Sequence, residues 1–143
     1  LALDALCEAF PDEKQRFIDK VGAVDNSTVK IYGLKHFIQD DKKAVEELAD
    51  MCSPAFEFRT RISALSAFEA LDKLPESVVF HAMDAAVHFN SRLARQGQSL
   101  LEKNWDESIQ RLCDRHLKKM DLVPWQVSKW ESFLTKMNSR TEE

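Results

Sequence analysis

Glycine and proline are scarce in this chain, with 3 Gly and 4 Pro among 143 residues. An all-β protein of this length would need more turn-forming residues to connect its strands. The composition therefore predicts an all-α protein. A chain of this length is also sufficient for a single domain with one continuous core.

Cysteine is present without a pattern. Cys7, Cys52 and Cys113 are far apart in the sequence and form no C-x-x-C pair. This excludes a disulfide framework and a cysteine-rich zinc site, and we expect the thiols to be buried. The compartment is unknown from the sequence, with the cytoplasm slightly favoured by the cysteine usage.

Long apolar runs, glycine-rich loops and catalytic motifs are all missing. No apolar run approaches the roughly 18 residues of a membrane span, so we expect no membrane partner. Gly22, Gly33 and Gly97 stand singly inside helical patterns, which favours close approach of helices over phosphate binding. We expect no catalytic residue, no cofactor and no metal.

An excess of basic residues is also lacking, because the net charge is −4. Residues 1–71 contain 9 Lys and Arg against 13 Asp and Glu, and residues 72–143 contain 11 against 11. A generic nucleic-acid-binding protein is expected to carry a basic face. The charge therefore argues against a nucleic-acid partner.

Helix-start signals recur regularly along the chain. Asp, Asn and Ser are favourable N-caps, and Pro is tolerated in a first helical turn. Short polar connections make consecutive helices antiparallel neighbours. The pattern predicts an α-solenoid of about four antiparallel helical hairpins in a single domain, residues 1–137, followed by a frayed polar tail, residues 138–143. The predicted starts lie near Pro11, Ser27, Asp41, Ser53, Pro75, Asn90, Asp106 and Pro124.

The longest apolar pattern follows Ser53. Phe58, Ile62, Leu65 and Phe68 recur at helical spacing, which predicts one buried face on this helix. We expect these four side chains to share a seam between helices.

Three segments can be aligned at a fixed offset. Lys30, Arg61 and Arg92 are each separated by 31 residues, and in the first two copies a small residue, Leu and Phe follow at fixed distances. Self-similarity of this period is typical of stacked helical repeats. The unit, most clearly in residues 25–30 and 58–65, resembles a HEAT or armadillo-like repeat. It has near-tetratricopeptide length but lacks that family's Trp-Leu-Gly-Tyr set.

A more particular resemblance concerns residues 59–65, 88–94 and 123–126. These strings are similar to the helical C-terminal region of some bacterial zinc aminopeptidases of the aminopeptidase N family. The catalytic H-E-x-x-H motif of that family is absent, so no zinc ligand or catalytic residue carries over. The resemblance implies a non-catalytic scaffold or accessory C-terminal domain of a larger protein. The alternative is a free-standing protein–protein interaction adaptor, and whether the parent is an enzyme stays open.

Four arginines are candidate partner-binding residues. If equivalent positions stack from repeat to repeat, these side chains form a ladder on a concave face that suits an acidic peptide, because arginine binds carboxylates through two parallel hydrogen bonds. The alternative is pairing with Glu57, Glu69 and neighbouring acids within the chain. The four are Arg59, Arg61, Arg92 and Arg95.

Trp125 and Trp130 are two further candidate partner-binding residues, since tryptophan is frequent at the centres of protein interfaces. The alternative is packing in the core or at the end of the stack, together with Trp105. A metal site is a weaker hypothesis. It would use residues of one helical face, His81, Asp84 and His88.

Overall fold

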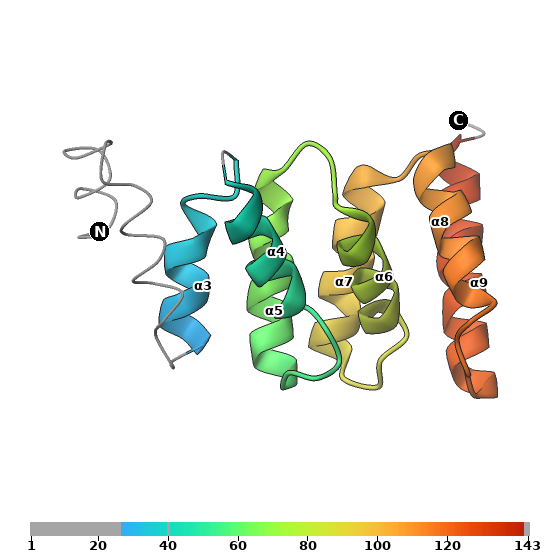
Figure 1. Ribbon diagram of the computed structural model, residues 1–143. Helices are drawn as coiled ribbons and strands as arrows, with labels where there is room; N and C mark the ends of the chain where they lie inside the picture. The colour runs from blue at the N-terminus through green and yellow to red at the C-terminus, as the bar shows by residue number, and fades with distance from the viewer. Residues whose placement is uncertain (1–26, 40, 142–143) are drawn as a thin grey trace.

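The computed structural model describes residues 27–39 and 41–141, and within them it contains seven α-helices, one short 3₁₀ helix and no strand (Figure 1). The predicted all-α fold is confirmed for this part of the chain. Cys7 and the helix predicted from Pro11 lie outside the described residues. The elements are α3 (Ser27–Lys35), α4 (Lys42–Asp50), α5 (Phe58–Ala67), η2 (Phe68–Ala70), α6 (Glu76–Ala86), α7 (Ser91–Asn104), α8 (Glu107–Leu117) and α9 (Pro124–Thr141).

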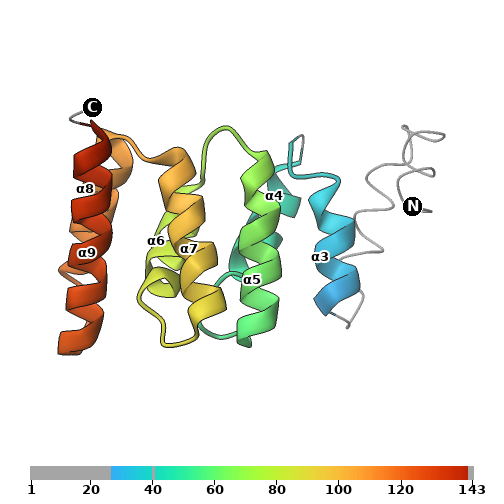
Figure 2. The ribbon, with the colours of Figure 1, turned by 180° about the vertical axis from the view of Figure 1, so that it is seen from behind.

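The helices form two layers. In one layer, α3 packs on α5 and α5 packs on α7, and α9 lies at the end of the row, so that all four face the viewer in Figure 2. In the other layer, α6 packs on α8, and α4, α6 and α8 face the viewer in Figure 1. We call these the first layer (α3, α5, α7, α9) and the second layer (α4, α6, α8).

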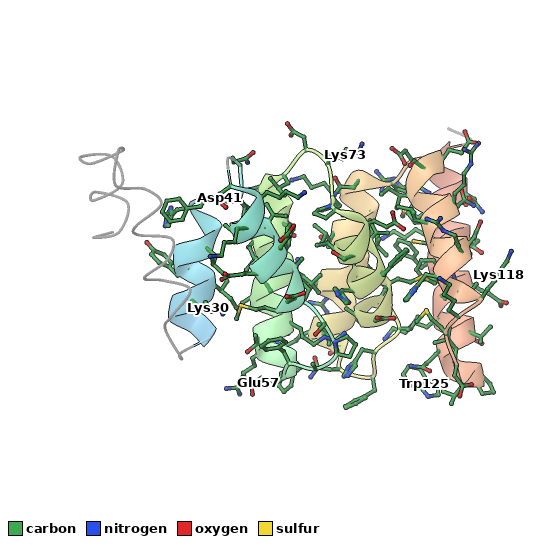
Figure 3. The ribbon with its side chains drawn as sticks, in the orientation of Figure 1. Lys30, Asp41, Glu57, Lys73, Lys118 and Trp125 are labelled. Carbon is green, nitrogen blue, oxygen red and sulfur yellow. The ribbon has the colours of Figure 1, made fainter. Side chains whose placement is uncertain are left out.

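Because the chain alternates between the layers, its connections gather at two opposite edges. Asp41 and Lys73 mark one edge in Figure 3, and Glu57 and Trp125 mark the other. The connections α4–α5, α6–α7 and α8–α9 all lie at this second edge, which we call the Trp125 edge (Figure 1).

Side-chain caps begin three of the helices as predicted. Asp41 accepts a hydrogen bond from the amide of Ala44, Asn90 caps α7, and Asp106 caps α8. Each carboxylate or amide oxygen satisfies a backbone donor that lacks a partner within the helix.

Ser53 does not begin a helix, contrary to the prediction. Turn hydrogen bonds continue from α4 until the amide of Phe56 donates to the carbonyl of Ser53, and α5 begins only at Phe58. The Ser53 hydroxyl instead accepts from the nearby amide of Ala55. The polar side chain therefore stabilises the turn itself.

The buried face of α5 is rotated from the predicted one. Leu65 and Phe68 are buried and Ile62 is half-buried, but Phe58 is 37% exposed. Phe58 is the first residue of the helix and lies at the Trp125 edge, where the chain enters α5. Thr60 and Arg61 take the buried positions instead.

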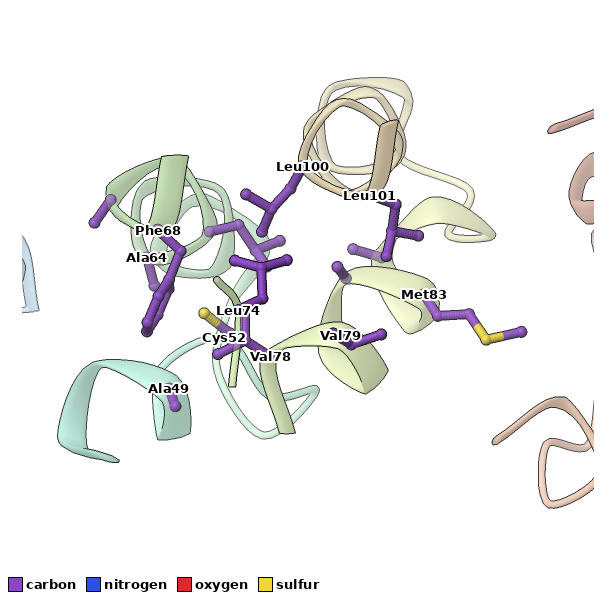
Figure 4. Packing of buried hydrophobic residues seen from close by; sticks show 14 of the residues in the cluster. Ala49, Cys52, Ala64, Phe68, Leu74, Val78, Val79, Met83, Leu100 and Leu101 are labelled. Carbon is purple, nitrogen blue, oxygen red and sulfur yellow. The ribbon is translucent and has the colours of Figure 1, made fainter. Parts of the chain in front are cut away.

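The core joins the two layers. Figure 4 shows Leu100 and Leu101 of α7 directed toward Val78 and Val79 of α6 and toward Leu74 in the connection before α6. Gly97 lies at the closest approach of α7 to α6, where an added Cβ would be 2.5 Å from the carbonyl oxygen of Ala82. Close helix approach, expected for the isolated glycines, is confirmed at Gly97.

An aromatic cluster closes the C-terminal end of the stack. The rings of Trp105, Trp130 and Phe133 pack with centroid distances of 5.2–6.5 Å, and Trp130 is buried. Helix α9 continues to Thr141, into the segment 138–143 that the sequence assigns to a polar tail.

Candidate functional site

The two layers carry opposite charge. Helices α3, α5 and α7 contain seven basic residues and one acidic residue, whereas α4, α6 and α8 contain four basic and seven acidic residues. Counting the two halves of the chain hides this difference, since each half contributes helices to both layers. The basic residues of α3, α5 and α7 are Lys30, Lys35, Arg59, Arg61, Arg92, Arg95 and Lys103.

Two arginines of the first layer occupy unfavourable helix positions. The N-terminus of a helix carries partial positive charge, so a base there costs about 0.3–1 kcal/mol. Arg59 and Arg92 are the second residues of α5 and α7, and neither helix has an acid in its first turn. Asn90, the cap of α7, is neutral, while Glu57 at the start of α5 makes no side-chain capping bond. Local stability therefore does not explain these arginines.

Three arginines of the first layer are exposed and lack acidic partners. Among the described residues, no carboxylate forms an ion pair with Arg59, Arg92 or Arg95. Glu69, one of the expected intramolecular partners, instead accepts a hydrogen bond from the side-chain amide of Gln96 at 3.0 Å. The three cations thus remain available to an external anion.

Two shallow hollows lie on the first layer: Arg92 and Arg95 line one of them, and Arg59 lies one helical turn before Ser63, which lines the other. One hollow lies between α3 and α5, and Tyr32, Lys35 and Ser66 are among the residues that line it. The other is formed on α7 by Arg92, Arg95, Gln96 and Ser99. Because Gln96 lines both hollows, they form one continuous surface across the three helices. We call this surface the α3–α5–α7 face.

Arg61 is not part of that face, which corrects the predicted four-arginine ladder. Only 4% of Arg61 is exposed, and its Nε donates to the carbonyl of Cys52 at 3.3 Å. Burial lowers the pKa of the Arg61 guanidinium, and the nearby Asp84 carboxylate opposes that shift. The ladder fails because two residues on a helix amount to more than half a turn, so Arg59 faces solvent and Arg61 faces the core.

The residues of the weaker metal hypothesis do not come together. Asp84 pairs with the ring of His116 at 3.0 Å and so joins α6 to α8. His88 instead accepts a hydrogen bond from the amide of Asn90. Burial lowers the pKa of His81. Within the described segments, no three His, Cys, Asp or Glu side chains are placed to hold a metal ion.

The described cysteines are unsuited to nucleophilic chemistry. Cys52 and Cys113 are buried and free, as predicted, and burial raises the pKa of each thiol to about 12. Both thiols are therefore protonated at neutral pH, and the thiolate is the reactive form of cysteine.

The two candidate tryptophans differ in their exposure to solvent. Trp130 is only 2% exposed and belongs to the aromatic cluster, which leaves it no surface for a partner. Trp125 is 48% exposed at the first turn of α9, and the Lys129 ammonium lies 5.9 Å from its ring centre. Only Trp125 remains available for binding.

Several residues of the α3–α5–α7 face escaped the sequence analysis. Tyr32, Ser63 and Gln96 are the sixth residues of α3, α5 and α7 and line the hollows together. Aligning the helices by their starts, and counting charges in alternate helices, would have revealed both these residues and the basic layer. The fixed offset of 31 residues instead aligned Arg92 with the buried Arg61.

Comparisons with protein families, with curated proteins and with solved structures found no match. The resemblance to the helical region of aminopeptidase N enzymes thus depends on the sequence strings alone. In the described part of the chain, no helix combines the length and apolar character that crossing a bilayer requires.

Proposed function

We propose that this chain is a non-catalytic helical-repeat module that binds an acidic segment of polypeptide on the α3–α5–α7 face. The observation that carries the proposal is the set of exposed arginines, Arg59, Arg92 and Arg95, which have no acidic partner among the described residues. Carboxylates are the protein groups that arginine binds best.

The repeat part of the proposal is supported by the order of the helices. Hairpins α4–α5, α6–α7 and α8–α9 follow one another, and α3 precedes them in the row. Such a row is the arrangement expected of an α-solenoid, in which each unit packs on its neighbours. Aligned faces of successive units then form an extended binding surface.

The acidic segment belongs either to another part of a longer polypeptide or to a separate protein. The first form is an accessory domain, as the similarity to aminopeptidase N helical regions implies, and the second is an adaptor. The same surface serves both forms, because each presents carboxylates to the same arginines.

A random-peptide display selection tests the proposal. The immobilised chain is the target, at about physiological ionic strength, where exposed charges are screened beyond about 8 Å. We expect the enriched peptides to be acidic and to lose binding to the double variant Arg92→Glu plus Arg95→Glu. Lys118→Glu reverses an exposed base of the second layer and should keep binding.

Two results would overturn the proposal. One is enrichment of neutral or basic peptides whose binding is indifferent to the double variant, or no enrichment at all. The other is tighter binding of polyuridine RNA than of any enriched peptide, with the same loss in the double variant. That second result would make the α3–α5–α7 face a nucleic-acid surface.

A further inference from the structure

Exposed aromatic side chains gather where α5 and α7 begin. Phe56 and Phe58 are 38% and 37% exposed, and Phe89, in the connection before α7, is 79% exposed. Helices α5 and α7 pack on each other, and both begin at the Trp125 edge (Figures 1 and 2). Single exposed apolar residues are ordinary, but several at one place mark an interaction surface.

These aromatics adjoin the unpaired arginines. Phe58 precedes Arg59, whose guanidinium carbon lies 5.8 Å from the Phe58 ring centre. Phe89 lies one turn before Arg92 in the sequence and immediately precedes Asn90, the cap of α7. The N-termini of α5 and α7 add partial positive charge at the same end. Cations and apolar surface therefore meet at one end of the α3–α5–α7 face.

A second copy of this chain is a poor occupant of this site. Its first layer is basic and would repel another first layer. Its second layer is acidic, but within the described residues of α4, α6 and α8 it exposes no large apolar side chain. Such a copy would thus bring carboxylates and no group to cover the phenylalanines.

We infer that the bound acidic segment carries a large apolar side chain next to its carboxylates. Resting on the proposed function, this inference adds the chemical class of the ligand. The apolar side chain docks on Phe56, Phe58 and Phe89, while the carboxylates meet Arg59 and Arg92. Neither feature of the ligand alone accounts for the surface. An acidic segment without an apolar side chain would leave the phenylalanines uncovered, and an apolar segment without acids would leave the arginines unpaired.

Two synthetic peptides test the inference by fluorescence anisotropy. They share one Glu- and Asp-rich sequence and differ only in a single Phe or Ser next to the acids. Removing one phenylalanine from water is expected to tighten binding about tenfold. Phe89→Ser should abolish most of that tenfold difference, and Phe56→Ser should reduce it. Val127→Ser removes an apolar side chain of α9 at the same edge that is as exposed as Phe56 (38%) and should leave the difference intact.

The outcomes separate this inference from the proposed function. Equal affinities of the two peptides, with binding lost in Arg92→Glu plus Arg95→Glu, would overturn the inference and leave the acidic-segment proposal standing. No binding of either peptide would reject both. A tenfold difference that survives Phe89→Ser, or that Val127→Ser removes to the same extent, would also show that the exposed phenylalanines do not bind the apolar side chain. Circular dichroism of each variant checks that the helices are intact, and concentration-dependent sedimentation would reveal a second copy as the occupant.

Discussion

The two layers of this protein differ in how some of their charged residues are paired and where those residues lie along the helices. In α8, of the second layer, Arg111 pairs with Glu107, and Arg115 pairs with Glu76 of α6. In the second layer, Asp106 and Glu107 begin α8 and Glu76 begins α6, where the helix dipole favours carboxylates, whereas α4 has Asp41 as its cap but begins with Lys42 and Lys43. In the first layer, Arg59 and Arg92 stand at helix starts with no such pairing. The first layer also forms ion pairs, from Glu102 to Lys136 and Arg140, so the contrast concerns its exposed arginines, which have no acidic partner among the described residues.

This difference is informative because natural sequences are usually consistent across local and global levels. Places where a local rule is broken without compensation tend to be functional. A net charge of −4 conceals the contrast, because α3, α5 and α7 hold six more bases than acids while α4, α6 and α8 hold three more acids than bases. The distribution of charge over the fold therefore says more about partners than its sum.

The largest expected effect concerns the core that both layers share. Leu65 of α5 is fully buried, so Leu65→Ala should lower the free energy of unfolding by about 2–5 kcal/mol through the cavity it leaves. Phe58→Ala, on the same helix but 37% exposed, should cost about 1 kcal/mol or less. Urea denaturation measures both. Equal losses would show that the face of α5 is not rotated as described.

A second change pushes the layers apart. In Gly97→Ala, the new Cβ would lie 2.5 Å from the carbonyl oxygen of Ala82 and 2.8 Å from the amide nitrogen of Ala86. We expect a loss of about 1–3 kcal/mol from overpacking against this backbone. Ser99→Ala, on the exposed side of the same helix, is the control. A gain of about 1 kcal/mol, the usual helix preference of Ala over Gly, would contradict the close approach.

Acidification should weaken the second layer. Burial lowers the pKa of His81 in α6 below its ordinary value of 6.5, and burial also lowers that of His88. Below about pH 6.5 the unfolded histidines are protonated while the folded ones resist protonation, so the unfolded state binds more protons. Stability should be at its full value above about pH 7. It should fall as the pH drops below about 6.5, where the unfolded histidines become protonated.

The pH dependence can be assigned with one variant. His81→Gln removes the more strongly enclosed imidazole, so its loss of stability between pH 7 and pH 5 should be smaller than that of the unsubstituted chain. Thermal unfolding at a series of pH values provides the comparison. Identical pH profiles would exclude His81 as a source of the acid sensitivity.

The smallest effect has an unusual sign. Arg92→Glu places an acid in the first turn of α7, where the dipole favours it, so it should raise stability by about 0.3–1 kcal/mol at low ionic strength. Arg115→Glu, in the last turn of α8 and opposite Glu76, should lower it by a comparable amount. High salt should shrink both changes. Destabilisation by Arg92→Glu would mean that Arg92 serves the fold after all.

Helix starts were the most predictable feature of this protein. Asp41, Asn90 and Asp106 were predicted to begin helices, and each does so through a hydrogen bond to an amide two or three residues later. Such bonds are local, so the sequence contains all the information they need. The close approach of helices at Gly97 was also predictable, because a lone glycine within a helical pattern usually marks a close contact.

The candidate site was only partly predictable. Arg59, Arg92 and Trp125 were selected from the sequence and are exposed, but Arg61 and Trp130 were selected on the same grounds and are buried. Residue type and spacing could not separate them. The rotation of a helix about its axis is decided by its neighbours, and those neighbours are distant in the sequence.

The sequence by itself determined the all-α class, the helix starts set by capping side chains and the alternation of helices along the chain, because these follow from local hydrogen bonds and turn chemistry. Only the tertiary structure decided that alternate helices share a layer, and hence that the exposed Arg59, Arg92 and Arg95 of α5 and α7 belong to the same layer. It also decided which arginine enters the core, since the carbonyl of Cys52 and the carboxylate of Asp84 approach Arg61 only after the layers pack.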